Sequence, residues 1–535
     1  ICDREEEINA FIPEEYWNLE ADLKQPGSKK ALAAKFYVNK DGKIAIRNKE
    51  ELDGILKELE GCDYVVDEVK NGERIKKAPI PFTTSTLQQE ASKVLNFSTQ
   101  KTMRLAQQLY EGVEVKGHGT VGLITYLRTD STRIAEEADT AARAFIEAQY
   151  GSKYVASGEQ AKKSGAKIQD AHEAIRPTDI SLTPVIVKES LQRDLFRLYQ
   201  LIWKRFAASR MQPAVYETTS VKVAAGDYCF TLAASKLAFD GFMSVYIQED
   251  EKEESSALLG RLEKGSVLTL EKLDSSQHFT QPPAHFTEAT LLAAMENPVK
   301  YMSSKDTQAA KTLGETGGLG TVATRADIIE KLFHTFLMEK RGNEIYLTSK
   351  AKQLLDLVPE DLKKPELTAD WEKKLSDISK GKLKQKVFLD GIREYTEEIV
   401  GEIKTGTGTF RHDNLTNKIC PNCGKRMLAV NGKNSKMLVC QDRECGYRET
   451  ISRTTNARCP KCHKRMEMLV KGKEETFVCA CGYKEKLSSF QARRAKEGAG
   501  VNKRDVQKYL KKQQKEAAEP VNNAFAQALS GIKLD

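Results

Sequence analysis

A chain of 535 residues is too long for one hydrophobic core, so we expect about three or four domains. Hydrophobic residues make up 40% of the chain and charged residues 30%, which excludes a wholly disordered protein. Lys and Arg exceed Asp and Glu by 84 to 76, a mild excess that is compatible with a polyanionic partner but does not identify one.

No apolar run approaches the length of about 18 residues that a membrane-spanning helix needs, so no membrane partner is expected. The start, ICDREEEINA, has neither the basic beginning nor the apolar core of a signal peptide, which predicts a cytoplasmic protein. Because the first residue is Ile1 rather than Met, we also expect the chain to begin partway through a longer polypeptide.

Hydrophobic patterning divides the first 400 residues into helical and strand-rich stretches. Strand-like runs and one charged helical pattern occupy the first 80 residues, two helices follow, and a compact α/β stretch extends to about residue 212. Strands are expected from 214 to 273 and mainly helices from 286 to 400, with a loop at 303–318. The segment 406–414 is expected to be a linker.

The segment GLITYLRTDS (122–131) is the first candidate for chemistry. Its front half is expected to be a strand, which places Tyr126 and Arg128 on one face with Cα atoms roughly 6.6 Å apart. A tyrosine phenolate can attack a phosphodiester there while the arginine balances charge on the non-bridging oxygens. A core tyrosine beside a surface arginine is the alternative, and the pattern alone leaves both open.

The segment AHEAIRPTDI (171–180) is the second candidate. It contains His172, Glu173 and Arg176, and Pro177 disfavours a helix at the residue before it. His172 can donate a hydrogen bond to a phosphate or take part in proton transfer. A structural histidine near a helix end is the alternative.

The glycine-rich stretch GETGGLGT (314–321) invites comparison with a phosphate-binding loop. It lacks the Gly-Lys-Ser/Thr ending of such loops, and no strand obviously precedes it. A flexible loop without nucleotide binding is therefore the favoured interpretation.

Cysteines gather towards the carboxyl end, with three in the first 419 residues and eight between Cys420 and Cys481. In a reducing compartment such a cluster indicates metal ligands rather than disulfides. Two sets repeat with a period of 39 residues, each with sixteen residues between its cysteine pairs, which is typical of zinc ribbons. The expected Zn²⁺ ligands are Cys420, Cys423, Cys440 and Cys445 in the first module, and Cys459, Cys462, Cys479 and Cys481 in the second.

The second module closes with Cys-Ala-Cys, which is tight for two ligands. His463 in place of one cysteine is therefore an alternative ligand, and a degenerate ribbon without metal is the other alternative. After the modules, residues 486–515 carry ten Lys or Arg against two Asp or Glu. This tail is expected to contact nucleic-acid phosphates without sequence preference, the alternative being a solvated tail kept soluble by its charge.

Four motifs, in this order, resemble those of type IA DNA topoisomerases: PFTTSTLQQEASKVLNFSTQKTMRLAQQLYEG, GLITYLRTDS, AHEAIRPT and GGLGTVATRADIIEKL. The form ETGGLGTVATRADII and the stretch NPVKYMSSKDTQAAKTLGETGG are most similar to bacterial topoisomerase III. The resemblance covers Ile1 to about residue 400, and the cysteine modules and basic tail also suit the family. It implies a multidomain fold of mixed α and β with a toroidal core that opens to admit a strand, followed by C-terminal zinc ribbons.

Matched position by position, the resemblance implies that Tyr126 forms a 5′-phosphotyrosyl link, that Arg128 assists it, and that His172 lies beside the scissile phosphate. The residues expected to bind DNA are Gln88, Arg176, Thr324 and Arg325. A Gly-Arg-Pro-Ser-Thr-Tyr run of the topoisomerase I branch is replaced here by residues 320–325, so contacts made by its arginine and tyrosine are not carried over.

The family carries an N-terminal acidic domain, the toprim fold, whose Asp-x-Asp pair binds Mg²⁺. No two aspartates of this chain are two positions apart, and its start resembles the family just after that domain. We therefore expect the toprim domain to be missing from this chain, the Mg²⁺ site to belong to the full-length enzyme, and the chain alone to be inactive.

The function expected from the resemblance is ATP-independent breakage and rejoining of single DNA strands, which relaxes or decatenates DNA. The expected partner is DNA, mainly single-stranded, and the expected state is a monomer associated with the nucleoid. The alternatives are a non-catalytic single-stranded DNA-binding zinc-ribbon protein and a tyrosine recombinase, for which we find no dispersed Arg-His-Arg set. The expected domains are a helical base binding single-stranded DNA (1–22 and 285–405), a strand-rich hinge arch (23–85 and 213–284), a catalytic tyrosine domain (86–212), two zinc ribbons (418–448 and 457–485) and a basic tail (486–535).

Overall fold

The computed structural model of the chain describes residues 1–28, 30–39, 46–156, 172–246, 262–302, 307–406, 408, 414–431, 435–442, 444–471 and 474–496. The chain divides into two compact units, Ile1–Phe410 and Arg411–Asp535, and each is described by itself. The expected linker at 406–414 falls mostly outside the described residues, as does the tail beyond Lys496. No helix within the described ranges is both long and apolar enough to cross a lipid bilayer.

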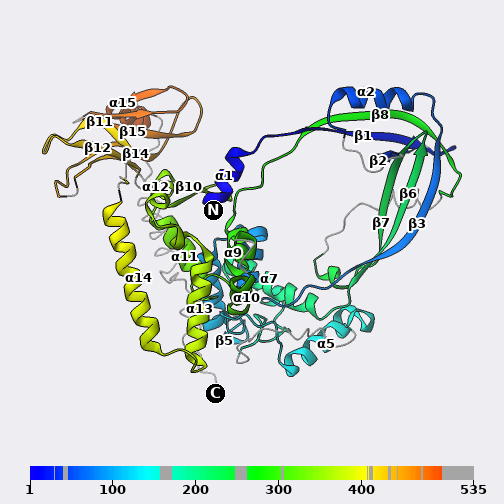
Figure 1. Ribbon diagram of the computed structural model, residues 1–535, viewed down its shortest axis with the longest axis horizontal. Coiled ribbons are helices and arrows are strands. Elements are labelled where there is room, and N and C mark those ends of the chain that lie inside the picture. Colours follow the sequence, from blue (N-terminus) through cyan, green and yellow to red (C-terminus); the bar gives the residue numbers. More distant parts are fainter. Residues whose placement is uncertain are drawn as a thin grey trace, which may run out of the picture. The chain divides into compact units, whose positions relative to one another are not determined.

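A closed antiparallel barrel is the main strand assembly of the first unit (Figure 1). Its strands follow the order β1-β2-β7-β6-β3-β8, and helix α2 (Lys49–Leu59) packs Leu52, Ile55 and Leu59 into the same core. The strands expected between 214 and 273 are confirmed as three members of this barrel. The bounds are β1 (Glu15–Lys24), β2 (Ala31–Asn39), β3 (Tyr64–Lys76), β6 (Ala214–Ala225), β7 (Tyr228–Phe239) and β8 (Val267–Phe279).

Residues 15–22, which the sequence analysis assigns to the helical base, lie in the barrel. Strand β1 pairs with β8 on one side and with β2 on the other. Its buried residues alternate, because Leu19, Ala21 and Leu23 face the core of the barrel. Apolar residues at every second position are buried together only when the segment becomes a strand of a sheet.

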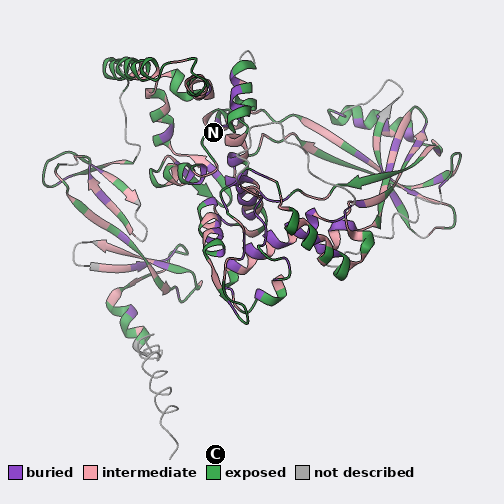
Figure 2. Cartoon of the chain, turned by 90° about the horizontal axis from the view of Figure 1, so that it is seen from below, coloured by how far each residue is buried: buried purple, intermediate pink, exposed green. Residues whose placement is uncertain are grey.

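Helices enclose the segment that carries Tyr126. Leu195, Leu198 and Ile202 recur on one face of α7 and pack with Leu105 and Leu109 of α4 in a single core. Buried residues concentrate in the helical body and recur along the barrel strands (Figure 2). The elements are α3 (Thr84–Glu90), the π-helix η1 (Ala91–Leu95), α4 (Thr99–Glu111), β4 (Val113–Val115), β5 (Gly119–Val121), α5 (Glu136–Tyr150), the 3₁₀ turns η2 (Ser152–Tyr154) and η3 (Gly241–Val245), α6 (Pro184–Val187) and α7 (Arg193–Ser209).

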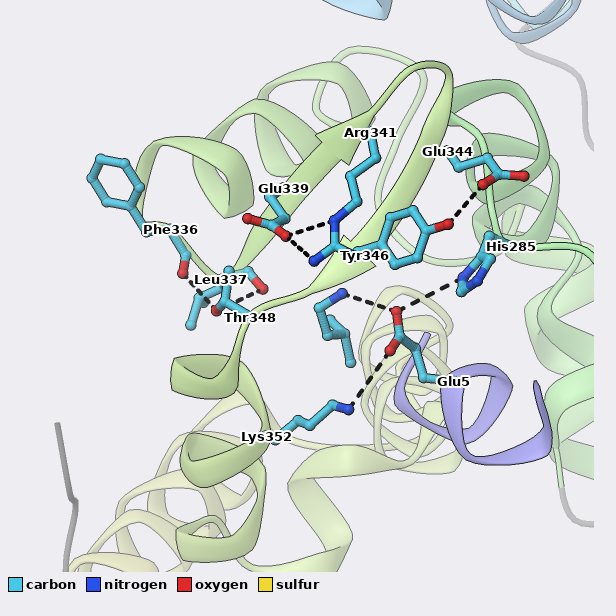
Figure 3. Close-up of polar contacts among 11 residues, drawn as sticks. Glu5, His285, Phe336, Leu337, Glu339, Arg341, Glu344, Tyr346, Thr348 and Lys352 are labelled. Atoms are coloured by element: carbon cyan, nitrogen blue, oxygen red, sulfur yellow. Dashed lines mark hydrogen bonds and ion pairs between the residues drawn. The ribbon is translucent and has the colours of Figure 1, made fainter. Parts of the chain in front are cut away.

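The remaining part of the first unit is mainly helical, as expected for 286–400. Helix α1 docks onto it through Glu5, which accepts a hydrogen bond from the Leu347 N–H over 3.1 Å and lies 3.6 Å from the Lys352 ammonium (Figure 3). The elements are α1 (Cys2–Ala10), α9 (Glu288–Glu296), η4 (Pro298–Tyr301), α10 (Thr307–Thr316), α11 (Arg325–His334), the hairpin β9 (Met338–Arg341) and β10 (Glu344–Leu347), α12 (Ser349–Leu357), η5 (Glu360–Lys363), α13 (Pro365–Ser379) and α14 (Gln385–Thr405).

The loop expected at 303–318 is wrong over most of its described length, because helix α10 occupies Thr307–Thr316. Ala309 and Leu313, four residues apart, form one apolar face and bury against Ala369 of α13. This tertiary contact outweighs the weak helix propensity of the glycine within α10. Residues 303–306 lie outside the described ranges.

The second unit is a seven-stranded antiparallel sheet whose strands follow chain order. Each cysteine module contributes a turn that carries its first cysteine pair and a hairpin that returns its second pair. The elements are β11 (Leu415–Ile419), β12 (Arg426–Asn431), β13 (Ser435–Cys440), β14 (Arg448–Arg458), β15 (Arg465–Lys471), β16 (Glu474–Val478), β17 (Lys484–Lys486) and α15 (Leu487–Lys496).

Candidate active site and metal centres

The segment around Tyr126 is not a strand, which corrects the sequence analysis. Strand β5 ends at Val121, and within 122–131, all of which the structure describes, the pairing continues only as an isolated bridge between Ile124 and Pro177. The segment does not form the expected strand because a buried side chain, rather than a neighbouring strand, holds its backbone.

That side chain is Thr84, which clamps the backbone on both sides of Arg128. Its buried hydroxyl donates to the Leu127 carbonyl over 2.7 Å and accepts from the Thr129 N–H over 2.8 Å. Leu127 and Thr129 are consequently buried, whereas Tyr126 and Arg128 are exposed. The two candidate side chains therefore both face solvent, although no strand ladder enforces the alternation.

Backbone pairing brings the histidine segment to the tyrosine segment, because the Thr125 N–H donates to the Arg176 carbonyl over 2.9 Å. The imidazole of His172 packs against the phenol ring of Tyr126, with ring centroids 4.8 Å apart and an interplanar angle of 38°. The ring of Tyr110 meets the same phenol edge to face, with centroids 5.5 Å apart at 71°. Tyr126 thus has two aromatic neighbours while 37% of its surface stays exposed.

Arg176 is 9% exposed and is paired within the protein. Its Nε donates to the Glu173 carboxylate over 2.9 Å, and its Nη1 donates to the Pro177 carbonyl over 2.9 Å. Burial alone would raise the pKa of Glu173, but the hydrogen bonds from Arg176 and from the Ala135 N–H lower this pKa below its ordinary value. The pair therefore stabilises the turn that carries His172.

The glycine-rich loop before α11 is built around Arg325, which is 3% exposed. The guanidinium donates to three carbonyls within residues 317–320, and burial lowers the pKa of Arg325 below its usual range. Thr324 is exposed just before α11, with its hydroxyl 3.1 Å from that of Thr321. The loop thus folds around an arginine side chain of its own segment.

Helix α3 joins the tyrosine region to the glycine-rich loop through α9. The Ser85 hydroxyl donates to the Glu296 carboxylate over 2.6 Å, and the Leu319 N–H donates to the Met295 carbonyl over 2.7 Å. On α3, Gln88 is 1% exposed, and its Nε2 has no hydrogen-bond partner among the described residues. The segments that carry the expected catalytic and DNA-binding residues of the first unit are therefore connected. The connections are either direct hydrogen bonds between segments or hydrogen bonds through α3 and α9.

Each cysteine set gathers its four sulfur atoms within 4.8 Å of one another. The sulfur–sulfur distances include 3.7 and 3.3 Å in the first set and 3.6 and 3.3 Å in the second. A tetrahedral site with Zn–S bonds of about 2.3 Å needs roughly 3.8 Å between sulfurs, so both sets fit Zn²⁺. His463 is not part of the second set, whose four cysteines suffice without it.

The two cysteine sets are the only groups of three or more His, Cys, Asp or Glu side chains with metal-binding spacing among the described residues. The described part of the chain therefore holds no acidic cluster that fits Mg²⁺.

Two residues of the site, Thr84 and Tyr110, were not predicted from the sequence. Thr84 lies in the run TTST, which has the composition of a helix N-terminus and carries no sign of a contact 43 residues away. Tyr110 is one of 17 tyrosines and lies on the amphipathic helix α4. No local signal distinguishes either residue.

Comparison with known proteins gives consistent matches over most of the chain. A family model described as DNA topoisomerase matches residues 1–390. The DNA topoisomerase 3 of Bacillus subtilis (strain 168) is 44% identical over 548 residues, which cover 100% of this chain and 73% of that protein. The DNA topoisomerase 3 of Bacillus thuringiensis (strain Al Hakam) is 43% identical with the same coverage. The solved structure of full-length topoisomerase I from Thermotoga maritima is 28% identical, with a TM-score of 0.59 over 91% of this chain and 69% of that one.

Proposed function

The chain belongs to the type IA DNA topoisomerases and has a topoisomerase III-like function, and we propose that Tyr126 is the nucleophile that breaks the DNA strand. The observation that carries the proposal is the exposed Tyr126 phenol held between His172 and Tyr110. Its backbone is pinned by Thr84, so the phenol is positioned before DNA binds. Such positioning favours attack because less orientational freedom is lost in the reaction.

In the proposed reaction, the Tyr126 oxygen bonds to phosphorus while the bond from phosphorus to the 3′ oxygen of the preceding nucleotide breaks. The phenol loses its proton and the departing 3′ oxygen gains one, so the 5′ phosphate stays on the protein. Attack by the same 3′ hydroxyl reverses both bond changes and frees the tyrosine. Because the covalent link conserves the phosphodiester, the cycle needs no ATP.

In the proposed reaction, neighbouring residues stabilise the charge that develops on the phosphate and hold the DNA strand. Arg128, exposed beside Tyr126, balances the charge that develops on the non-bridging oxygens. His172 donates a hydrogen bond to the phosphate or exchanges the proton. We assign strand contacts to Thr324 and to Gln88, whose buried Nε2 has no hydrogen-bond partner among the described residues, with Arg176 and Arg325 holding the segments beside them.

The wider assignments are part of the same proposal. The substrate is mainly single-stranded DNA, and the protein acts as a monomer at the nucleoid in the cytoplasm. The barrel serves as the hinge arch, residues 86–212 as the catalytic domain, and residues 285–405 with the N-terminal helix as the base.

Zn²⁺ binds in the two ribbons, 418–448 and 457–485, and the basic tail 486–535 contacts the phosphates of the DNA backbone. Mg²⁺ is proposed as the second cofactor, bound in the full-length enzyme.

The proposal is tested by trapping the covalent intermediate on a single-stranded oligonucleotide labelled at its 3′ end. The chain is assayed alone and with the Mg²⁺-binding domain of a type IA topoisomerase supplied, since the chain alone is expected to be inactive. We expect a nuclease-trimmed nucleotide on Tyr126 by mass spectrometry, complete loss of the adduct in Tyr126→Phe and its retention in Tyr110→Phe. A nucleotide on another side chain, or cleavage that survives Tyr126→Phe, would contradict the proposal.

A further inference from the structure

Phe336 combines two features that rarely occur together in one residue. It follows the C-terminal end of α11 with a φ of +57°, in the left-handed region, and 69% of its surface is exposed. The Phe336 N–H donates to the Phe333 carbonyl and the Leu337 N–H to the Leu332 carbonyl, both over 3.0 Å. This is the helix ending at which glycine is normally found, because a Cβ is unfavourable in that conformation.

The other non-glycine residues with positive φ among the described residues are Asn96 and His463. Asparagine and histidine are enriched in this conformation, whereas a bulky aromatic residue is an outlier. Since the ring of Phe336 is largely exposed, burial in this unit does not offset the unfavourable backbone. Such outliers are retained where a side chain has a function.

The backbone of Phe336 is held firmly while its ring is left free. The Thr348 hydroxyl donates to the Phe336 carbonyl over 2.8 Å, and the Lys350 ammonium donates to the adjacent Thr335 carbonyl over 2.7 Å. The ring points away from the hairpin and from the polar contacts around Glu5 (Figure 3). A rigid backbone with a projecting aromatic ring loses little conformational entropy when the ring is covered.

The surroundings of the ring suit a nucleic-acid strand. Lys331 and His334 are exposed on the last turn of α11, and Lys350 lies against the end of the same helix. Helix α11 has ten residues and is about 15 Å long at 1.5 Å per residue, with Thr324 just before its first residue and Phe336 two residues beyond its last. A strand that contacts Thr324 reaches that far in about four or five nucleotides even at the 3.4 Å spacing of stacked bases.

We propose that Phe336 is a stacking platform for an unpaired base of the DNA strand that passes α11. Aromatic side chains bind single strands in this way because every base offers a π-face, and the neighbouring Lys331 and Lys350 attract the backbone. A base in duplex DNA is already stacked on both sides, so the platform is selective for single strands. The proposal rests on the proposed function only for the identity of the ligand as DNA.

The test uses three substitutions that separate the ring from the backbone. Phe336→Leu keeps a Cβ in the left-handed conformation and removes the π-face, Phe336→Gly removes both, and Phe336→Trp keeps the π-face. Affinity is measured by fluorescence anisotropy for a labelled oligodeoxyadenylate of about 15 nucleotides and for a hairpin duplex. Thermal unfolding of each variant is followed in parallel.

We expect Phe336→Leu and Phe336→Gly to bind the single strand about 5- to 50-fold more weakly, with duplex binding and Phe336→Trp unchanged. Phe336→Gly should also unfold about 1 to 3 °C higher, because the strained backbone is relieved. Asn96→Gly, which changes the other non-glycine residue with a positive φ among the described residues of the first unit, is the control and should leave DNA binding unchanged.

Unchanged single-strand affinity in Phe336→Leu and Phe336→Gly would overturn the proposal, as would an equal loss for the duplex. Because the readout is binding and not cleavage, such a failure is distinct from a failure of Tyr126 as the nucleophile. The adduct assay on the same variants reports the latter separately.

Discussion

Around Tyr126 the backbone rests on a core of 30 buried apolar residues, whereas the two cysteine modules have buried clusters of four and five residues. Two of the residues in each module's cluster are themselves cysteines. The tyrosine region buries enough apolar surface to hold the proposed nucleophile in place by packing and hydrogen bonds alone. The modules bury too little for that, so we expect their order to depend on a bound Zn²⁺.

The comparison shows how the same chain stabilises functional groups in two different ways. Near Tyr126, the essential contact is a neutral hydrogen-bonded threonine that is inaccessible to water. In the modules, the essential contacts are thiolates that converge on one point. The two regions should therefore respond to different perturbations.

Removal of Zn²⁺ is expected to have the largest effect and to fall on the second unit alone. Apparent binding free energies at such sites are about 10–16 kcal/mol, far more than the small clusters supply. Chelation should abolish the strand signals of residues 415–486 in NMR spectra while the thermal transition of the first unit stays in place. Dispersed signals from the modules after complete chelation would show that the metal is not required.

Thr84→Val is expected to have the next largest effect and to fall on the first unit. The substitution leaves the buried Leu127 carbonyl and Thr129 N–H without their partner, which costs about 1–3 kcal/mol of unfolding free energy. Cleavage should fall with it, because the Tyr126 segment loses its clamp. Thr178→Val, at an exposed hydroxyl that donates to the Gly122 carbonyl, is the matched control and should cost less.

We expect the ion pair of Glu173 and Arg176 to make a smaller, pH-dependent contribution to the free energy of unfolding. The folded state holds the pKa of Glu173 below its ordinary value of 4.5, so the pair stabilises the fold above about that pH. This stability is lost as the pH falls through the lowered pKa of the folded state. Glu173→Gln should cost about 1 kcal/mol in urea unfolding at pH 7 and less at pH 3. Glu114→Gln, at an exposed position of strand β4, is the control and should leave the unfolding free energy unchanged at both pH values. A cost that is independent of pH would argue against this ion pair.

The smallest effect concerns the turn that follows the first cysteine pair of each module. Gly424 and His463 occupy equivalent places, 39 residues apart, with φ values of +72° and +57°. His463→Gly should stabilise the second module by up to about 1 kcal/mol, and Gly424→His should destabilise the first by a similar amount. Zinc competition against a chelator measures both. A loss of zinc affinity in His463→Gly would instead identify His463 as a ligand.

The cysteine sets, the segments of Tyr126 and His172, and the strands of 214–273 were all accessible to sequence reasoning, because each has a local pattern of spacing or period. The strand expected at Tyr126, the loop expected at 303–318 and the place of residues 15–22 were wrong for one shared reason. In each case a partner far away in the chain, namely Thr84, Ala369 or strand β8, sets the local conformation. Thr84 and Tyr110 entered the site without any local signal at all.

Residue types and their spacing were therefore enough to predict which groups carry the chemistry, since phenol, guanidinium, imidazole and thiolate have reactivities of their own. Which groups meet, and which of them are exposed, depended on long-range packing. Arg176 and Arg325 illustrate this, because both are cations in the sequence and both are buried donors in the fold. Burial and pairing are properties of the assembled core, and no short window of sequence contains them.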